Sequence, residues 1–352
     1  MVLRSAPSHS VFFLALIFLF SLTSSSCAQS ASAKRTEQLF KSVCTLSLYD
    51  HASEASFKAV WERLREIDSM MNMWDEHSAL SLLNSNAGRG PQPVPPELVS
   101  ALIPALELSL LSGGLYDPTV GPLVKLWAVG TREAAVPEPS AIGSALALID
   151  WQAVKVQEAD TQGAAPTIDL MRSGMALDFG SLAKGYGARE AARILSARGV
   201  KKAIIDIGGC IIALGSNPKG RPWKIGVQDP SGERGSQVIG YFLAKDQAAD
   251  TSGIYERYFE QDAQKYHHIM DTKTGYPVEN DLQSVSLLID WRTNSDGPPL
   301  ALLAMGSECG LELANRMAWA VVFIRRDKTV LLSKAAKKLF VLTSSEYKLI
   351  KE

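Results

Sequence analysis

Cysteine is scarce in this sequence, and the lack of paired cysteine patterns excludes several kinds of site. The chain has four cysteines in 352 residues, with no CxxC pair and no Cys/His spacing suited to zinc. Beyond Cys27, the cysteines Cys44, Cys210 and Cys309 lie among apolar or small residues. We therefore expect no disulfide framework, and we interpret these three as buried small apolar side chains rather than reactive thiols.

An excess of charge of either sign is also lacking. The 36 basic and 37 acidic residues leave a formal net charge of -1, so no chain-wide electrostatic argument favours binding to nucleic acid. The apolar content of 46% is typical of an ordinary globular chain. The length allows one large domain or two closely packed ones.

Long apolar runs are missing except at the N-terminus. Arg4 precedes the run Val11–Phe20, and the small-residue stretch SLTSSSC follows it and ends at Cys27. Such a run is too short for a permanent membrane helix, so the pattern predicts a secretion signal over residues 1–27. Residues 28–38 are expected to form a linker, and residues 39–352 the folded domain.

The residues before Cys27 resemble the lipobox of bacterial lipoproteins, although Ser24 stands where leucine is typical. We expect Cys27 to be acylated, which would leave a periplasmic protein anchored to the inner membrane through its lipid. Plain cleavage of the signal and an uncleaved anchor are the alternatives. In each case the domain is exported.

The first half of the domain is predicted to be mainly helical. Apolar residues recur at helical spacing over Ser53–Met71 and over Glu97–Leu111. The next segment, GGLYDPTVGPLVKLWAVG (113–130), has too many Gly and Pro residues for a regular element and too many apolar ones for a solvated loop. It is either backbone shaped around a ligand or a packed loop in which Asp117 caps the next turn.

The segment MALDFGSLAKGYGARE predicts a short strand from Met175, a Gly-Ser turn and a helix that ends at Gly199. A strand, a tight turn and a helix start together form a candidate anion site. Lys184 and the helix amides would hold a phosphate, and Asp178 would receive amide or imide hydrogens of a ligand. A merely solvated lysine in the first helical turn is the alternative.

The second half is predicted to be rich in strands. These cover Ala203–Ile207, Cys210–Leu214, Trp223–Val227, Tyr266–Met270 and Ser284–Ile289. We therefore expect an α+β fold with mixed helices and largely antiparallel strands around a cleft.

Two adjacent histidines follow a Ser-Gly pair in DTSGIYERYFEQDAQKYHHIMDTKTGYPV (250–278). A strand would place His267 and His268 on opposite faces, so only one of them can point into a given site. A neutral imidazole can accept the proton of a hydroxyl if a carboxylate orients it, and Asp271 and Asp296 are the candidate carboxylates. A buried structural histidine is the alternative.

Four segments resemble successive motifs of the ApbE family, the FAD:protein FMN transferases, in the same order. They are GGLYDPTVGPLVKLWAVG, LDFGSLAKGYGARE, DIGGCIIALGSNPKGRPWKIGVQDP and TSGIYERYFEQDAQKYHHIMDTKTGYPV. The earlier segment MMNMWDEHSALSLLN also resembles the N-terminal region of the family. The resemblance implies an ApbE-like α+β domain around a flavin-binding cleft.

The resemblance also implies an activity. Mg²⁺ and FAD bind, a threonine hydroxyl of an exported acceptor flavoprotein of the redox-pump subunit type attacks the FMN phosphorus, and AMP leaves. By the same resemblance, His268 is the base, with Ser252 and Asp296 completing the catalytic group. A hard cation with oxygen ligands would neutralise the charge of the pyrophosphate.

The binding residues of the family carry over to named positions. The flavin contacts are Leu115, Tyr116, Asp117, Asp178 and Lys184, and the metal contacts are Ser181, Asp296 and Leu300.

The sequence departs from the family pattern at two positions. Leu300 stands where the family has threonine and offers only its backbone carbonyl, and Pro298 and Pro299 stand where a helix would begin. Ile254 replaces the polar residue common after the Ser-Gly pair. An FAD pyrophosphatase that gives FMN and AMP, and a non-catalytic flavin-binding lipoprotein, are therefore the alternatives to the transferase.

Overall fold

The computed structural model describes residues 32–350 except 160–162, 234 and 294–295. The predicted signal peptide and the acylation of Cys27 lie outside the described residues. The helices are α1 (Glu54–Met71), α2 (Ala79–Ser85), α3 (Pro96–Leu111), α4 (Gly121–Trp127), α5 (Pro139–Leu146), α6 (Ala183–Ala197) and α7 (Pro298–Arg316). The strands are β1 (Ala33–Leu39), β2 (Ser42–Leu48), β3 (Gln92–Pro93), β4 (Val154–Gln157), β5 (Thr167–Leu170), β6 (Ala203–Ile207), β7 (Cys210–Leu214), β8 (Trp223–Gln228), β9 (Val238–Ala244), β10 (Gln247–Gly253), β11 (Tyr258–Gln261), β12 (Gln264–His267), β13 (Leu282–Asp290), β14 (Ala320–Arg325), β15 (Thr329–Leu332), β16 (Phe340–Leu342) and β17 (Lys348–Leu349).

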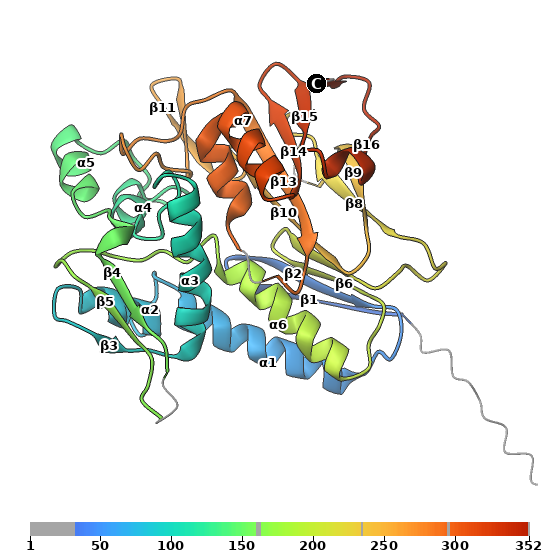
Figure 1. Cartoon of the computed structure of the whole chain (residues 1–352), viewed down its shortest axis with the longest axis horizontal. Helices are drawn as coiled ribbons and strands as arrows, with labels where there is room; N and C mark the ends of the chain where they lie inside the picture. Colours follow the sequence, from blue (N-terminus) through green and yellow to red (C-terminus); the bar gives the residue numbers. More distant parts are fainter. Residues whose placement is uncertain (1–31, 160–162, 234, 294–295, 351–352) are drawn as a thin grey trace, which may run out of the picture.

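One large sheet organises the described part of the chain. Its strand order is β1-β2-β6-β7-β10-β13-β14-β15-β17, and the neighbours are antiparallel except β15 and β17 (Figure 1). The expected α+β fold with largely antiparallel strands is confirmed. Since side chains alternate along a strand, Asp250 and Ser252 of β10 share one face of the sheet while Ala249 lies on the other.

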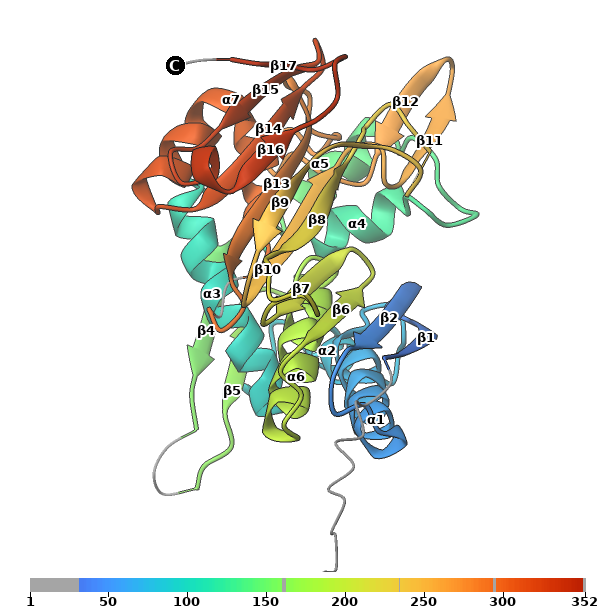
Figure 2. The ribbon, with the colours of Figure 1, turned by 90° about the vertical axis from the view of Figure 1, so that its right-hand side faces the viewer.

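Helices cover one face of this sheet, and a smaller sheet covers part of the other. α1 and α6 pack on the half that contains β2, β6 and β7, through a core that includes Leu46, Leu64 and Leu195. α7 packs on β13 and β14, where Leu302 meets Phe323 and its neighbours. On the opposite face, the β16-β9-β8 sheet packs against β10, β13 and β14 (Figure 2). Asp250 and Ser252 therefore point toward the helical layer.

The two helices predicted from apolar spacing are confirmed as α1 and α3. α1 begins after Ser53, whose Oγ accepts a hydrogen bond from the Ser56 amide at 3.2 Å, and it buries the apolar stripe that the sequence shows. The predicted strands β6, β7 and β8 are also present. Gly208 and Gly209, both with positive φ, form the turn that joins β6 to β7.

Three features of the local structure differ from the predictions. The segment that starts at Met175 forms no strand, because the amides of Leu177 and Asp178 bond to the Asn84 side chain and the Pro118 carbonyl instead of a neighbouring strand. Cys309 is exposed on α7, whereas Cys44 and Cys210 are buried as expected. The strand β1 begins at Ala33, inside the segment that we expected to be a linker.

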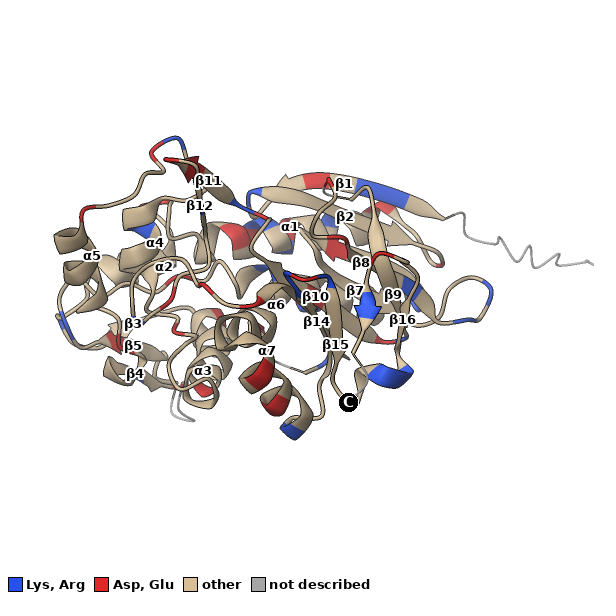
Figure 3. Cartoon of the chain, turned by 90° about the horizontal axis from the view of Figure 1, so that it is seen from above, with Lys and Arg blue, Asp and Glu red and all other residues tan. Residues whose placement is uncertain are grey.

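Charged residues of both signs are interspersed along the described chain (Figure 3). Within residues 32–350, apart from the gaps, no helix has both the length and the apolar character needed to cross a bilayer.

Candidate functional site

The candidate site lies beside the first turn of α6, where the 113–130 loop, the β10–β11 corner and the loop before α7 meet. Tyr116 connects three of these segments. Its hydroxyl oxygen lies 3.1 Å from Ser181 Oγ, and a Cβ atom at Gly297 would lie 3.0 Å from the same oxygen. The predicted flavin loop and two of the predicted metal segments are therefore in contact through one buried phenol.

The Asp117 carboxylate forms hydrogen bonds within its own loop and with the main chain at Trp151. Its carboxylate accepts hydrogen bonds from the amide and hydroxyl of Thr119 at 2.8 and 2.7 Å, and from the Trp151 amide at 3.0 Å. Burial raises the pKa of the Asp117 carboxyl, against these bonds. The contacts of the Asp117 carboxylate fit the interpretation of this segment as a packed loop. The neighbouring Leu115 is half-buried, at the surface of the loop.

Asp178 and Lys184 lie on the two sides of the turn before α6. The Asp178 carboxylate accepts the Gly180 amide at 2.9 Å, and burial raises its pKa although Arg257 and Lys41 act in the opposite direction. The Lys184 ammonium donates to the Gly208 carbonyl at 3.3 Å. No side chain of the N-cap residue bonds to the first amides of α6, so no cap compensates the positive end of the helix dipole.

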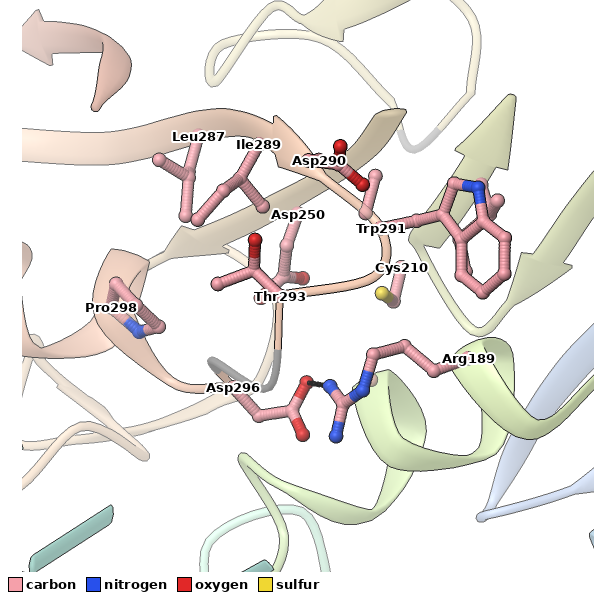
Figure 4. Close-up of a pocket in the computed structure, with 13 residues that line it drawn as sticks. Arg189, Cys210, Asp250, Leu287, Ile289, Asp290, Trp291, Thr293, Asp296 and Pro298 are labelled. Carbon is pink, nitrogen blue, oxygen red and sulfur yellow. Dashed lines mark hydrogen bonds and ion pairs between the residues drawn. The ribbon is translucent and has the colours of Figure 1, made fainter. Parts of the chain in front are cut away.

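Asp296 lies over the first turn of α6 and is paired with a cation of that helix. Figure 4 shows its carboxylate joined to the Arg189 guanidinium, and both side chains are largely buried. A Cβ atom at Gly185 would lie 2.0 Å from Asp296 Oδ1, so the carboxylate occupies the space that a larger residue would fill. Burial raises the pKa of Asp296, and Arg189 lowers it.

Asp250 is a second carboxylate on the same pocket wall, which also includes Cys210 and Asp296 (Figure 4). Its backbone neighbour, the Thr251 amide, donates to it at 2.9 Å. Burial and the nearby Asp296 raise the pKa of Asp250 to about 7, against the effect of Lys184. Asp250 is not among the residues predicted from the sequence, although it is the one carboxylate inside the otherwise uncharged strand QAADTSG.

His268 lies just beyond the end of β12, which stops at His267 rather than at Met270. Its Nδ1 lies 3.1 Å from the Arg257 carbonyl, and the His268 amide donates to that carbonyl at 3.2 Å. Burial, followed by the nearby Arg257, lowers the pKa of His268 to about 3, so the ring is neutral at physiological pH. Nδ1 carries the proton, since its partner only accepts, and Nε2 keeps its lone pair.

The other histidine and the expected orienting carboxylate have structural roles. His267 is buried, and its ring bonds to the Val278 carbonyl at 2.9 Å and to the Ile269 amide at 3.3 Å. Asp271 accepts the Lys273 amide at 2.7 Å within a turn. The expectation that a carboxylate orients the imidazole is therefore wrong, because the main-chain carbonyl of Arg257 does so.

The three predicted catalytic residues lie on separate segments around the site. Ser252 is on β10 and half-buried, His268 follows β12, and Asp296 precedes α7. In the described residues no hydrogen bond joins any two of them. The charge of Lys184 lowers the pKa of both His268 and Asp250, in each case as a smaller effect than that of burial.

The proline pair before Leu300 is accommodated at the start of α7. α7 begins at Pro298, so Pro298 and Pro299 occupy the first two positions, where a missing N–H is tolerated. Leu300 is half-buried in the first turn, and its amide donates to the Gly297 carbonyl at 3.0 Å. The described residues contain no group of three or more His, Cys, Asp or Glu arranged as a metal site.

Two cations near the site, Lys41 and Arg257, were also not predicted from the sequence. Lys41 follows Phe40 in a turn where both residues have positive φ, and its ammonium lies 4.7 Å above the exposed ring of Trp74. Arg257 is close enough to affect the pKa of Lys41. The two positive φ angles form a tight turn between β1 and β2, but no Gly or Asn at these positions indicates such a turn in the sequence.

Comparisons with known proteins agree with these observations. The ApbE family model matches residues 40–323. An FAD:protein FMN transferase of Treponema pallidum is 33% identical over 309 residues, which cover 84% of this chain and 85% of that protein, and one of Klebsiella pneumoniae is 31% identical, covering 89% and 95%. A flavin transferase ApbE structure from Vibrio cholerae matches with a TM-score of 0.75 at 26% identity, covering 88% of this chain and 99% of that one.

An ApbE protein structure from Thermotoga maritima matches with a TM-score of 0.77 at 26% identity, covering 87% of this chain and 98% of that one. The family match spans the helices α1 to α7, the strands β2, β6, β7, β10 and β13 of the large sheet, and the site residues from Leu115 to Leu300. Sequence, topology and site geometry agree, and the chain belongs to the ApbE family.

Proposed function

We propose that this protein transfers the FMN moiety of FAD to a threonine hydroxyl of an exported flavoprotein and releases AMP. The relatives named above carry the name of FAD:protein FMN transferase. The observation that carries the proposal is the neutral imidazole of His268, fixed through Nδ1 and placed beside the cations Lys184 and Arg257. A base next to cations suits the attack of a hydroxyl on a phosphate.

The substrate FAD has two parts that the site can hold separately. The carboxylate of Asp178, at the end of the loop before α6, is suited to the imide and amide hydrogens of the flavin ring. The start of α6 and the Lys184 ammonium are suited to the pyrophosphate. This division supports FAD as the donor, because riboflavin lacks the second part.

The transfer balances with the groups present. The threonine hydroxyl gives its proton to Nε2 of His268, and its oxygen forms a bond to the phosphorus of the FMN phosphate. The anhydride P–O bond breaks, and its electron pair leaves on the phosphate of AMP. General-base help of this kind contributes about 10² to 10⁴ in rate.

The oxygen atoms near Tyr116 fit a hard cation. Ser181 offers a hydroxyl, Asp296 a carboxylate and Leu300 a main-chain carbonyl, which are the ligand types that Mg²⁺ takes in proteins, usually together with water. Bound Mg²⁺ would neutralise charge on the pyrophosphate oxygens.

Product analysis tests the proposal. The purified chain is incubated with FAD, Mg²⁺ and an exported flavoprotein domain that carries an acceptor threonine, and the acceptor is weighed by mass spectrometry while AMP is measured. The proposal expects AMP together with one FMN added to the acceptor. AMP and free FMN without a labelled acceptor would indicate an FAD pyrophosphatase, and retention of unchanged FAD would indicate a flavin-binding lipoprotein.

We also propose that the protein is periplasmic and anchored to the inner membrane by a lipid on Cys27. The apolar run Val11–Phe20 and the small residues before the cysteine support this. A Cys27→Ala variant should move from the membrane fraction to the soluble periplasmic fraction when cells are fractionated. Unchanged membrane association would instead favour an uncleaved anchor.

A further inference from the structure

The side chain of Arg257 is a cation near the site that bonds to no other described residue. It forms the corner between β10 and β11, and its side chain is exposed. A Cβ atom at Gly130 would lie 3.4 Å from Arg257 Cδ, so the aliphatic stem rests against the end of the 113–130 loop. Among the described residues, the guanidinium has no hydrogen bond or ion pair.

The Arg257 guanidinium is close enough to act on both the ring-binding and the transfer parts of the site. Burial raises the pKa of Asp178, and the charge of Arg257 opposes this rise; burial lowers the pKa of His268, and the charge of Arg257 adds to this fall. The Asp178 carboxylate nevertheless bonds to the Gly180 amide and not to Arg257. The position of Arg257 therefore is not explained by a salt bridge with the nearest carboxylate.

The main chain of the same residue holds the proposed base. The Arg257 carbonyl accepts from His268 Nδ1 at 3.1 Å and from the His268 amide at 3.2 Å. A single residue thus fixes the imidazole through its backbone and places a guanidinium beside it. The cation and the base therefore both lie at the base of the β11–β12 hairpin.

We propose that the Arg257 side chain binds the phosphate group that is transferred, so that it acts as a second catalytic cation beside Lys184. This inference rests on the proposed function. Lys184 already donates to the Gly208 carbonyl, whereas the fork of Arg257 is uncommitted and matches two phosphate oxygens at once. As the hydroxyl loses its proton and the P–O bond breaks, negative charge grows on those oxygens and strengthens this contact.

Substitutions at this position separate the side chain from the backbone, because every residue keeps the carbonyl that holds His268. We expect Arg257→Ala to slow FMN transfer by about 10² to 10³, as for loss of one donor to a developing anion. Its affinity for FAD should fall about tenfold, while its affinity for riboflavin should not change. Added guanidinium ion should restore part of the rate, and Arg257→Lys should restore less than the native residue.

The matched control is Arg198→Ala. Arg198 is exposed at the other end of α6, about 20 Å from its first turn at 1.5 Å per residue. This variant should transfer FMN and bind FAD like the wild type. The comparison separates the local effect from a general loss of positive charge.

Two results would overturn the inference. One is an Arg257→Ala variant that transfers FMN at the wild-type rate. The other is an equal loss of FAD and riboflavin affinity together with a lower melting temperature, which would give the side chain a structural role. If the wild type itself labels no acceptor, the proposed function fails, and the preference for FAD over riboflavin in fluorescence titration still decides the role of Arg257.

Discussion

The most direct way to disturb Asp296 is to fill the space at Gly185. This glycine has helical dihedral angles in the first turn of α6, so alanine can adopt its backbone conformation. The added Cβ atom would lie 2.0 Å from Asp296 Oδ1 and 2.7 Å from its Cγ. Ordinary contact begins at 3.4 Å, so the carboxylate must retreat by about 1.4 Å, the difference between 3.4 and 2.0 Å.

Two opposing effects follow from Gly185→Ala. Alanine is preferred over glycine inside a helix by about 1 kcal/mol, and this gain opposes part of the cost of moving the buried Asp296 carboxylate away from Arg189 in the free energy of unfolding. A displacement of about 1 Å in a catalytic group costs about 10² in rate. We therefore expect transfer to fall by about 10² or more while the melting temperature changes by only a few degrees.

The assay is single-turnover FMN transfer followed by mass spectrometry, with calorimetry on the same samples. Gly143→Ala is the control, since Gly143 lies inside α5, gains the same helix propensity, and has no atom within 4 Å of its added Cβ. A Gly185→Ala enzyme with wild-type activity would refute the reasoning, because it would show that transfer does not need Asp296 where the structure places it.

Two further predictions concern the same pocket. The folded pKa of Asp250 is raised from 3.8 to about 7, so the folded state binds more protons than the unfolded state in that range, and stability falls as pH rises from about 4 to 7 by at most about 4 kcal/mol. Asp250→Asn should therefore gain more in melting temperature at pH 8 than at pH 4, and an equal gain at both would contradict the assignment. Leu300→Thr adds a hydroxyl to the proposed metal ligands, so transfer should need less Mg²⁺ in a titration; an unchanged requirement would mean that the carbonyl suffices.

Local elements with a strong pattern could be predicted from the sequence. The apolar stripe of α1 and its Ser53 cap are encoded within a few residues. The segment from Met175 could not be predicted as a loop, because its amides bond to Asn84, which lies more than 90 residues earlier in the chain. Its apolar residues are buried, but its amides do not pair with a strand.

The types of residue in the site could be predicted from the sequence, but the contacts between them could not. His268 was predicted as a candidate base. The carbonyl that orients it belongs to Arg257, and because every residue has a main-chain carbonyl, such an acceptor cannot be recognised from the sequence. The Asp296–Arg189 pair joins residues 107 apart, and pairing at that separation depends on the packing of α6 against the start of α7. The effect of the proline pair on the backbone could not be predicted, because it depends on whether the pair falls within or at the start of a helix.

The central claim is that His268 Nε2 takes the proton of the acceptor hydroxyl. The measurement that tests it most directly is the single-turnover rate of FMN transfer by His268→Ala at saturating FAD, with FAD affinity and melting temperature measured on the same protein. We expect a folded variant that binds FAD and transfers more slowly by about 10² or more. His267→Ala should lose stability instead, because its ring is buried and bonded to the main chain. Transfer by His268→Ala at the wild-type rate would contradict the account.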